Sequence, residues 1–169
     1  MPHIKSGLSE LGLSVTAIKY IIVTHVHLDH AGGAGLLLKE CPDAKIIVHP
    51  KGARHLVCPE RLIAGAKAVY KEDFDVLFDP VIPVPEERIL IMGDKEQLAI
   101  SENCVLEFID SPGHANHHFS IFDPISKGIF AGDVLGIVYE DDSFGRFCLP
   151  STSPNQFNPE AMLKSAERL

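Results

Sequence analysis

A cluster of histidine and aspartate directly after a short apolar segment places the strongest constraint on how this chain can fold. Residues 25–30 read His-Val-His-Leu-Asp-His, and an apolar run at 18–23 stands just before them. β-Branched side chains in that run predict a buried strand over residues 18–24. Imidazole and carboxylate groups are the ligands that bind zinc or iron near neutral pH. A strand that ends in such a cluster brings several ligands to one point, which predicts a metal site, and the number of ligands favours two metals.

Two further apolar segments end in residues that can bind metals. The run at 105–110 leads into Ser-Pro-Gly-His at 111–114, where Pro-Gly favours a tight turn that presents His114 at the end of a strand. The run that begins at 128 ends in Asp133, directly after a glycine. Carboxylates are rarely buried unless they are paired or bound to a metal. The alternative, a histidine-rich loop in solvent, would account for the first segment but not for these two.

The three motifs resemble those of the metallo-β-lactamase-fold hydrolases. The segment THVHLDHAGG at 24–33 resembles the signature THxHxDHxGG of that family, and SPGH at 111–114 resembles its TPGH turn. The segment FAGD at 130–133 resembles its strand that ends in a metal-bridging Asp. The motifs follow the order of the family over residues 18–136, and they specify the superfamily rather than a substrate. The resemblance implies an α+β fold, an αββα sandwich, with residues 1–169 as a single metallo-β-lactamase-like domain.

The same resemblance implies a set of metal ligands. These are His25, His27 and His114 for a first metal, Asp29 and His30 for a second metal, and Asp133 as the bridge between the two. The expected cofactor is Zn²⁺, as two ions, with iron or manganese as alternatives. Asp29 is also the expected catalytic residue, because its carboxylate could orient the nucleophile or accept its proton. His118 follows the ligand turn and is a candidate for binding substrate, with a structural hydrogen bond as the alternative.

The chain departs from the family pattern at both ends. Members usually carry strands before the first motif, whereas only about one helix of sequence comes first here. A last histidine that completes the second metal site normally follows a helix near the C-terminus, and this chain stops at Leu169, inside the predicted helix. We therefore expect a partial domain without the first strands and the C-terminal ligand segment. Its first metal site would be complete and its second incomplete.

The remaining sequence predicts helices that flank a series of short strands. Helices are expected at 5–11, at 33–40, over part of 51–79 as one or two helices, and from Asn158 onward, where a cap residue precedes Pro and Glu. Strands are expected at 45–49, 87–92, 97–100, 104–109, 119–123 and 127–131, and the last five are predicted to form an antiparallel meander. Three prolines within 80–85 predict an extended loop rather than a central strand.

Composition and charge restrict the classes of partner. A hydrophobic fraction of 46% over 169 residues is sufficient for a packed core. The net charge of −8 argues against a nucleic-acid partner, because phosphate binding requires a basic face. The sequence shows neither an apolar run long enough to span a membrane nor a signal-peptide pattern, so the expected location is cytoplasmic and no membrane partner is expected. The expected partner is a small-molecule substrate, and the oligomeric state is left open.

The ligand set predicts hydrolysis. A bound Zn²⁺ lowers the pKa of its water towards ~7, so that a metal-bound hydroxide can attack a carbonyl while a metal stabilises the oxyanion. A thioester is the first choice of substrate, as in glyoxalase II, because a thiolate leaves without much help from an acid; a lactone or another ester comes next. A mono-iron persulfide dioxygenase is an alternative that would need only His25, His114 and Asp133. An inactive metal-binding remnant is another, and failure to bind metal would identify it.

Overall fold

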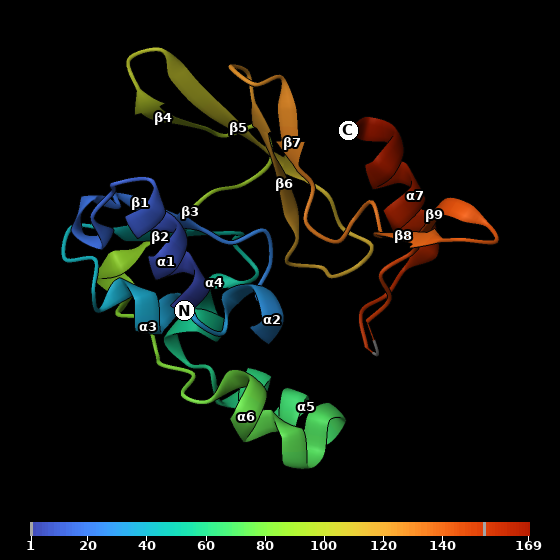
Figure 1. Cartoon of the computed structure of the whole chain (residues 1–169), viewed down its shortest axis with the longest axis horizontal. Coiled ribbons are helices and arrows are strands. Elements are labelled where there is room, and N and C mark those ends of the chain that lie inside the picture. Colours follow the sequence, from blue (N-terminus) through green and yellow to red (C-terminus); the bar gives the residue numbers. More distant parts are fainter. Residues whose placement is uncertain (1, 154) are drawn as a thin grey trace. The chain divides into compact units, whose positions relative to one another are not determined.

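The computed structural model describes residues 2–153 and 155–169, whose backbone contacts form two compact units. The first unit ends at Ile91 and the second begins at Met92. Helices lie between the strands of the first unit, whereas the second unit consists of consecutive strands followed by one helix, and each unit has a sheet of its own (Figure 1). A single domain over 1–169 stays a prediction, and the two units are described separately.

Three parallel strands form the sheet of the first unit. They are β1 (Tyr20–Ile22), β2 (Lys45–Val48) and β3 (Ile89–Ile91), in that order across the sheet. Ile22 pairs with Ile47 and Val48 pairs with Ile91, so the carboxyl ends of the strands meet at one edge. The expectation that 87–92 belongs to the antiparallel meander is wrong, because β3 pairs with β2 in parallel. A short apolar run predicts a strand but does not specify its partner.

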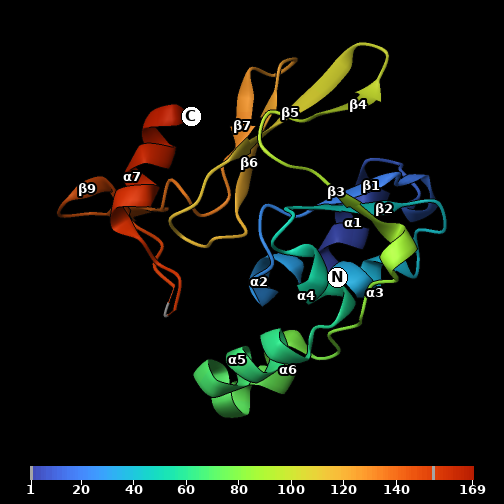
Figure 2. The same ribbon diagram turned by 180° about the vertical axis from the view of Figure 1, so that it is seen from behind.

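Helices connect the strands of the first unit, since parallel strands require crossover connections. The connecting helices are α2 (Leu28–Ala31) and α3 (Ala34–Leu38) between β1 and β2, and α4 (Ala53–Val57), α5 (Glu60–Tyr70) and α6 (Phe74–Phe78) between β2 and β3. Helix α1 (Pro2–Glu10) precedes β1, and 3-10 turns lie at 15–17, 71–73 and 86–88. In both views α5 and α6 lie side by side, away from the sheet (Figures 1 and 2). The segment 51–79 holds three α-helices rather than one or two, because Pro59 separates α4 from α5 and Lys71, with φ 48°, ends α5.

The core of the first unit lies between the sheet and the helices that follow its first two strands. Val23 and Val26, from the segment after β1, pack there with Ile46 and Val48 of β2 and with Leu37 of α3. All five side chains are buried. The turn that carries the histidines is therefore anchored by its own apolar residue, Val26, which is fully buried.

Four antiparallel strands form the main sheet of the second unit, as the meander predicts. They are β4 (Gln97–Ser101), β5 (Cys104–Asp110), β6 (Phe119–Asp123) and β7 (Gly128–Phe130), and their order in the sheet is their order in the chain. Phe108 and Phe119 are fully buried and pack edge to face, with ring centroids 4.9 Å apart. The predicted ligands His114 and Asp133 each follow the end of one of these strands.

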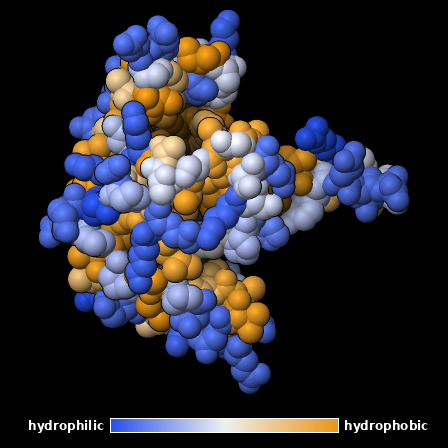
Figure 3. All heavy atoms as spheres, turned by 60° about the vertical axis from the view of Figure 1, so that its left-hand side comes forward, coloured by the Kyte–Doolittle hydropathy of each residue, from blue (hydrophilic) through white to orange (hydrophobic). Residues whose placement is uncertain are grey.

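A two-stranded hairpin of the second unit, β8 (Ile137–Asp141) with β9 (Gly145–Leu149), is absent from the sequence prediction. Apolar residues alternate poorly with polar ones in its strands, and all of its residues are exposed. Tyr139 stacks on Phe147 with centroids 5.8 Å apart. Exposed apolar side chains are ordinary in a folded chain, and the face drawn in Figure 3 mixes hydrophilic and hydrophobic residues.

The last helix, α7 (Pro159–Arg168), begins where the sequence predicts. The Asn158 side chain accepts a hydrogen bond from the Ala161 N–H at 2.9 Å, which caps the helix. At the other end, the Arg168 guanidinium donates to both carboxylate oxygens of Asp94, at 2.6 and 2.9 Å. Both ends of α7 are thus fixed by side-chain hydrogen bonds. Within the described residues, none of the helices combines the length and the apolar character needed to cross a membrane.

Candidate metal centre

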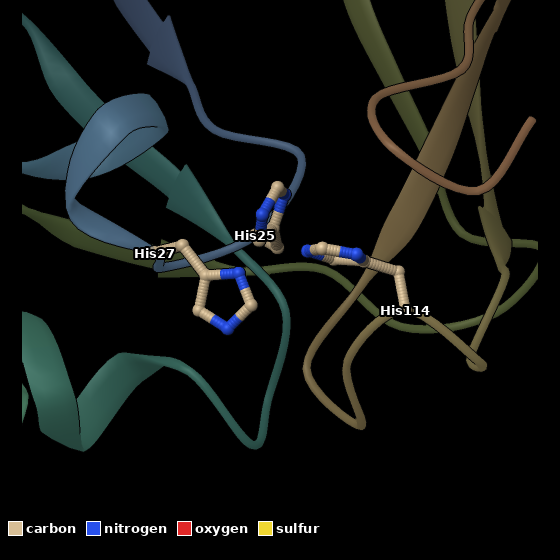
Figure 4. Close-up of side chains that lie close together, drawn as sticks. All are labelled: His25, His27 and His114. Atoms are coloured by element: carbon tan, nitrogen blue, oxygen red, sulfur yellow. The ribbon is translucent and has the colours of Figure 1, made fainter. Parts of the chain in front are cut away.

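The first group of predicted ligands lies where the chain leaves β1. The Val23 N–H still bonds to Ile47 O, at 3.2 Å, and the chain then turns away from the sheet. His25 and His27 lie on this turn, on either side of the buried Val26, and His27 is the residue before α2 (Figure 4). The third histidine of the motif, His30, lies on α2 itself. The turn is short, so that all three imidazoles stay close to the carboxyl edge of the sheet.

The three imidazoles of this group converge. The rings of His25 and His27 meet edge to face with centroids 4.6 Å apart, and those of His25 and His30 are 4.1 Å apart. In each of these pairs, one ligand nitrogen of either ring lies within 4.8 Å of the other. His25 is fully buried, and its Nδ1 lies 3.1 Å from Thr24 Oγ1. Clustered imidazoles of this kind suit zinc or iron.

Asp29 stands at the margin of this group. Its side chain is 58% exposed, and its Oδ2 lies 3.5 Å from Nε2 of His30. Among the residues that the structure describes, the compact groups of three potential ligand atoms do not include Asp29. The structure therefore places Asp29 beside one predicted ligand, with its carboxylate open to solvent.

The second group of predicted ligands lies in the second unit and consists of His114 and Asp133. His114 comes from the loop between β5 and β6 (Figure 4), and Asp133 follows β7. The Nε2 of His114 lies 3.4 Å from Oδ2 of Asp133, and their side chains are 4% and 18% exposed. Gly113 with φ 133° and Gly132 with φ 57° come directly before the two ligands. These backbone angles favour glycine, and they let the chain reverse sharply at each strand end.

Ser151 orients both members of this pair. Its backbone carbonyl lies 2.8 Å from Nδ1 of His114 and can only accept, so Nδ1 of His114 carries a proton and Nε2 is the nitrogen that could bind a metal. The Ser151 hydroxyl donates to Oδ2 of Asp133 at 2.9 Å. Metal-binding histidines commonly donate their second nitrogen to a carbonyl in this way. The residues of this pair therefore fit a metal, and Ser151, which holds both of them, is not among the residues that the sequence analysis singled out.

His118 lies in the interior of the second unit. It is fully buried, and its Nε2 accepts a hydrogen bond from the Asp133 N–H at 3.2 Å. Its Nδ1 lies 2.9 Å from the hydroxyl oxygen of Ser111. Both ring nitrogens are thus engaged inside the protein. This geometry favours the structural alternative for His118 over contact with a substrate.

Residues 2–169 match the family model of the metallo-beta-lactamase superfamily. The chain belongs to this superfamily. The match spans both compact units and confirms the family and the mixed α/β fold expected from the three motifs. Members of the superfamily are generally hydrolases, and their fold implies the binding of divalent metals.

Known relatives are similar over most of this chain. It is 25% identical over 140 residues to the metallo-beta-lactamase fold-containing protein ST1585 of Sulfurisphaera tokodaii, covering 81% of this chain and 50% of that protein. It is 27% identical over 120 residues to an atrochrysone carboxyl ACP thioesterase of Aspergillus fumigatus, covering 70% of this chain and 28% of that protein. The chain thus spans half or less of the length of these relatives.

Solved structures share the fold. The crystal structure of ST1585 superposes with a TM-score of 0.73 at 23% identity, over 89% of this chain and 56% of that chain. The structure of TTHA1623 in a di-iron-bound form superposes with a TM-score of 0.63 at 23% identity, over 98% of this chain and 69% of that chain. At these identities the likeness concerns the fold.

Proposed function

We propose that this chain is the core of a metal-dependent hydrolase that acts on a thioester, a lactone or another ester of a small molecule. The observation that carries the proposal is the pairing of His114 with Asp133. One imidazole nitrogen is turned towards a carboxylate, and the other is tied to a backbone carbonyl. A metal-binding histidine typically has its other ring nitrogen held by a carbonyl or carboxylate in this way, and Asp133 would be a second ligand beside it.

The proposed ligands combine the two groups described above. One metal would be bound by His25, His27 and His114, a second by Asp29 and His30, and Asp133 would bridge them. Membership of the superfamily supports this set, because the three motifs that carry it lie in the matched residues. The convergence of the imidazoles after β1 supports the assignments of His25, His27 and His30. The assignment of Asp29 rests on its place in the motif and on its contact with His30.

The residues of the chain would share the work of hydrolysis. When bound, a divalent metal supplies an acidic water and a Lewis acid for the carbonyl oxygen. Asp133, held by the Ser151 hydroxyl, would fix the position of the attacking water. Asp29, whose carboxylate is open to solvent, would accept the proton and release it to the medium. A thioester is the favoured substrate, because a similar protein is named as a thioesterase and because a thiolate leaves without a general acid.

Zn²⁺ is the proposed cofactor, and iron is the alternative that the di-iron neighbour in the same fold supports. With iron, the set of His25, His114 and Asp133 would also suit a mono-iron persulfide dioxygenase. The absence of a basic run in the sequence favours a small-molecule substrate over nucleic acid. A cytoplasmic location completes the proposal.

The test is a measurement of bound metal together with hydrolysis of a panel of thioesters and lactones. About two zinc ions per chain with thioester hydrolysis would support the proposal. His114→Ala should lose the first metal and the activity, while His3→Ala, an exposed histidine on α1, should change neither. Metal content that is unchanged in His114→Ala would contradict the ligand set. About one iron with oxygen consumption would favour the dioxygenase, and no bound metal would identify a remnant.

A further inference from the structure

A buried chain of hydrogen bonds runs through the second unit from the backbone of Asp133 to that of Ala131. The Asp133 N–H donates to Nε2 of His118 at 3.2 Å, and Nδ1 of His118 lies 2.9 Å from Ser111 Oγ. Ser111 Oγ lies 2.9 Å from Ser120 Oγ, which donates to the carbonyl of Ala131 at 3.2 Å. The side chains that form this series of hydrogen bonds, those of His118, Ser111 and Ser120, are fully buried.

The position of every proton in this chain of bonds follows from its two ends. A backbone N–H can only donate, so Nε2 of His118 accepts and the ring proton is on Nδ1. That proton is donated to Ser111, whose own proton must then go to Ser120. The Ser120 proton goes to the carbonyl of Ala131, which can only accept. His118 is therefore a neutral imidazole in a single tautomer.

The two ends of the chain of bonds hold the peptide groups on either side of Gly132. Gly132 has φ 57°, and a glycine is free to leave this conformation because no Cβ restrains it. With the carbonyl before it and the N–H after it both fixed, the turn has one orientation. The Ser111 N–H also bonds to the carbonyl of His118, at 3.1 Å, so the same network reaches the turn that leads to His114.

We infer that His118 is a positioning residue that fixes the turn at Gly132 and thereby aims the Asp133 carboxylate at the metals. The inference rests on the proposed function, because it takes Asp133 as a ligand. It assigns His118 a role apart from substrate: its Nε2 must accept a hydrogen bond from the Asp133 backbone. Partners that orient a ligand in this way typically change metal affinity 10- to 100-fold when they are lost.

Two substitutions distinguish the role of Nε2 of His118 from that of Nδ1. In His118→Gln the side-chain oxygen can take the place of Nε2 and accept from the Asp133 N–H. In His118→Asn the side chain is too short to reach that N–H, although it can still donate to Ser111. Cobalt affinity would be measured by competition with a chelator, and the cobalt spectrum and the thermal midpoint of the metal-free protein would be recorded alongside. We expect His118→Gln to stay within about threefold of the parent and His118→Asn to bind about 10- to 100-fold more weakly.

Equal cobalt affinity in the parent and in His118→Asn would overturn the inference while leaving the proposed function intact. A parent that binds no cobalt would overturn both. If the variants do not fold, ¹⁵N spectra of the parent decide: the inference requires His118 to be unprotonated at Nε2 and protonated at Nδ1. Protonation at Nε2 would overturn it. Ser111→Ala, which removes the acceptor for the Nδ1 proton, should perturb the His118 signals and lower cobalt affinity less than His118→Asn does.

Discussion

At the scale of single residues, the proposed ligands are held by neighbours that bind no metal themselves. Ser151 contacts both members of the pair in the second unit, but through different atoms. It holds His114 with its backbone carbonyl and Asp133 with its hydroxyl, at 2.8 and 2.9 Å. A side-chain substitution therefore releases the carboxylate and leaves the histidine in place.

Ser151→Ala should weaken metal binding without unfolding the protein. The hydroxyl is lost, so Asp133 gains freedom to rotate, and we expect about a 10-fold rise in the Kd for zinc. Ser151→Thr keeps a hydroxyl and is the matched control. Chelator competition on both variants measures the effect. Equal affinities in the alanine variant and the parent would mean that the hydroxyl has no part in aiming Asp133.

Asp29→Asn should remove the second metal and spare the first. Asp29 is proposed as a ligand of the second metal only, and its side chain is 58% exposed, so the fold should tolerate the change. We expect the metal content to fall from about two ions to about one, and kcat to fall at least about 100-fold, as for the loss of a general base. Asp43→Asn, another exposed aspartate, is the control. Two ions retained in Asp29→Asn would exclude this role.

At the scale of elements, the ends of neighbouring strands support one another. The turn after β2 packs under the turn that carries the first two histidines. A Cβ on Gly52 would lie 2.9 Å from Val26 Cγ1 and 3.0 Å from Val48 Cγ2, which is closer than ordinary contact. Because Val26 stands between His25 and His27, the packing at Gly52 sets the position of the two imidazoles.

Gly52→Ala should therefore lower both stability and metal affinity. Overpacking of this kind costs about 1–3 kcal/mol. Gly65→Ala is the matched control, because Gly65 lies within α5 and a Cβ there meets nothing within 4 Å. We expect that control to gain about 0.5–1 kcal/mol from its better helix propensity. Urea unfolding of the metal-free proteins measures the stability of both variants. A Gly52→Ala protein as stable as the parent would show that the turn after β2 adjusts to the added methyl group without cost.

The link between α7 and the segment before β4 should depend on pH. Burial opposes the charged form of Asp94, but hydrogen bonds from the Asp110 N–H and from Arg168 favour it more, so its pKa is lowered. The stability that the ionised Asp94 carboxylate contributes is therefore fully present above about pH 4, the ordinary pKa of an aspartate. It is lost as the pH falls through the lowered pKa of Asp94. Thermal midpoints of the parent and of Asp94→Asn should differ at neutral pH and converge in acid. A constant difference down to about pH 2 would contradict this assignment.

The sequence predicts those elements whose signals are local. The cap at Asn158 and the strand ends before His25, His114 and Asp133 are marked by neighbouring residues, and the structure confirms them. Ser151 carries no such mark, because its partners lie 37 and 18 residues away in the sequence. In the hairpin β8–β9 the apolar residues follow one another instead of alternating with polar ones, and all of them are exposed, so the hairpin lacks the pattern that predicts a half-buried strand.

At the scale of the whole molecule, each compact unit has its own sheet and supplies its own share of the proposed ligands. Zinc should then stabilise the protein by mass action, by about 2.7 kcal/mol at a concentration 100 times the Kd. Calorimetry with and without a chelator measures it. His25→Ala and His114→Ala, one change in each unit, should each reduce the shift, because each removes a proposed ligand of the first metal, and an unchanged shift in either variant would contradict the ligand set.

The contact between Gly113 and α7 gives the ligand turn a second attachment. A Cβ at Gly113 would run into the backbone of Met162, and the Asn158 N–H bonds to the carbonyl of Gly113 at 2.7 Å. The glycine is thus needed both for its φ of 133° and for the close approach of a helix. A designer who transplants this ligand turn into another scaffold would have to move α7 with it, because the helix and the turn form a single transferable part.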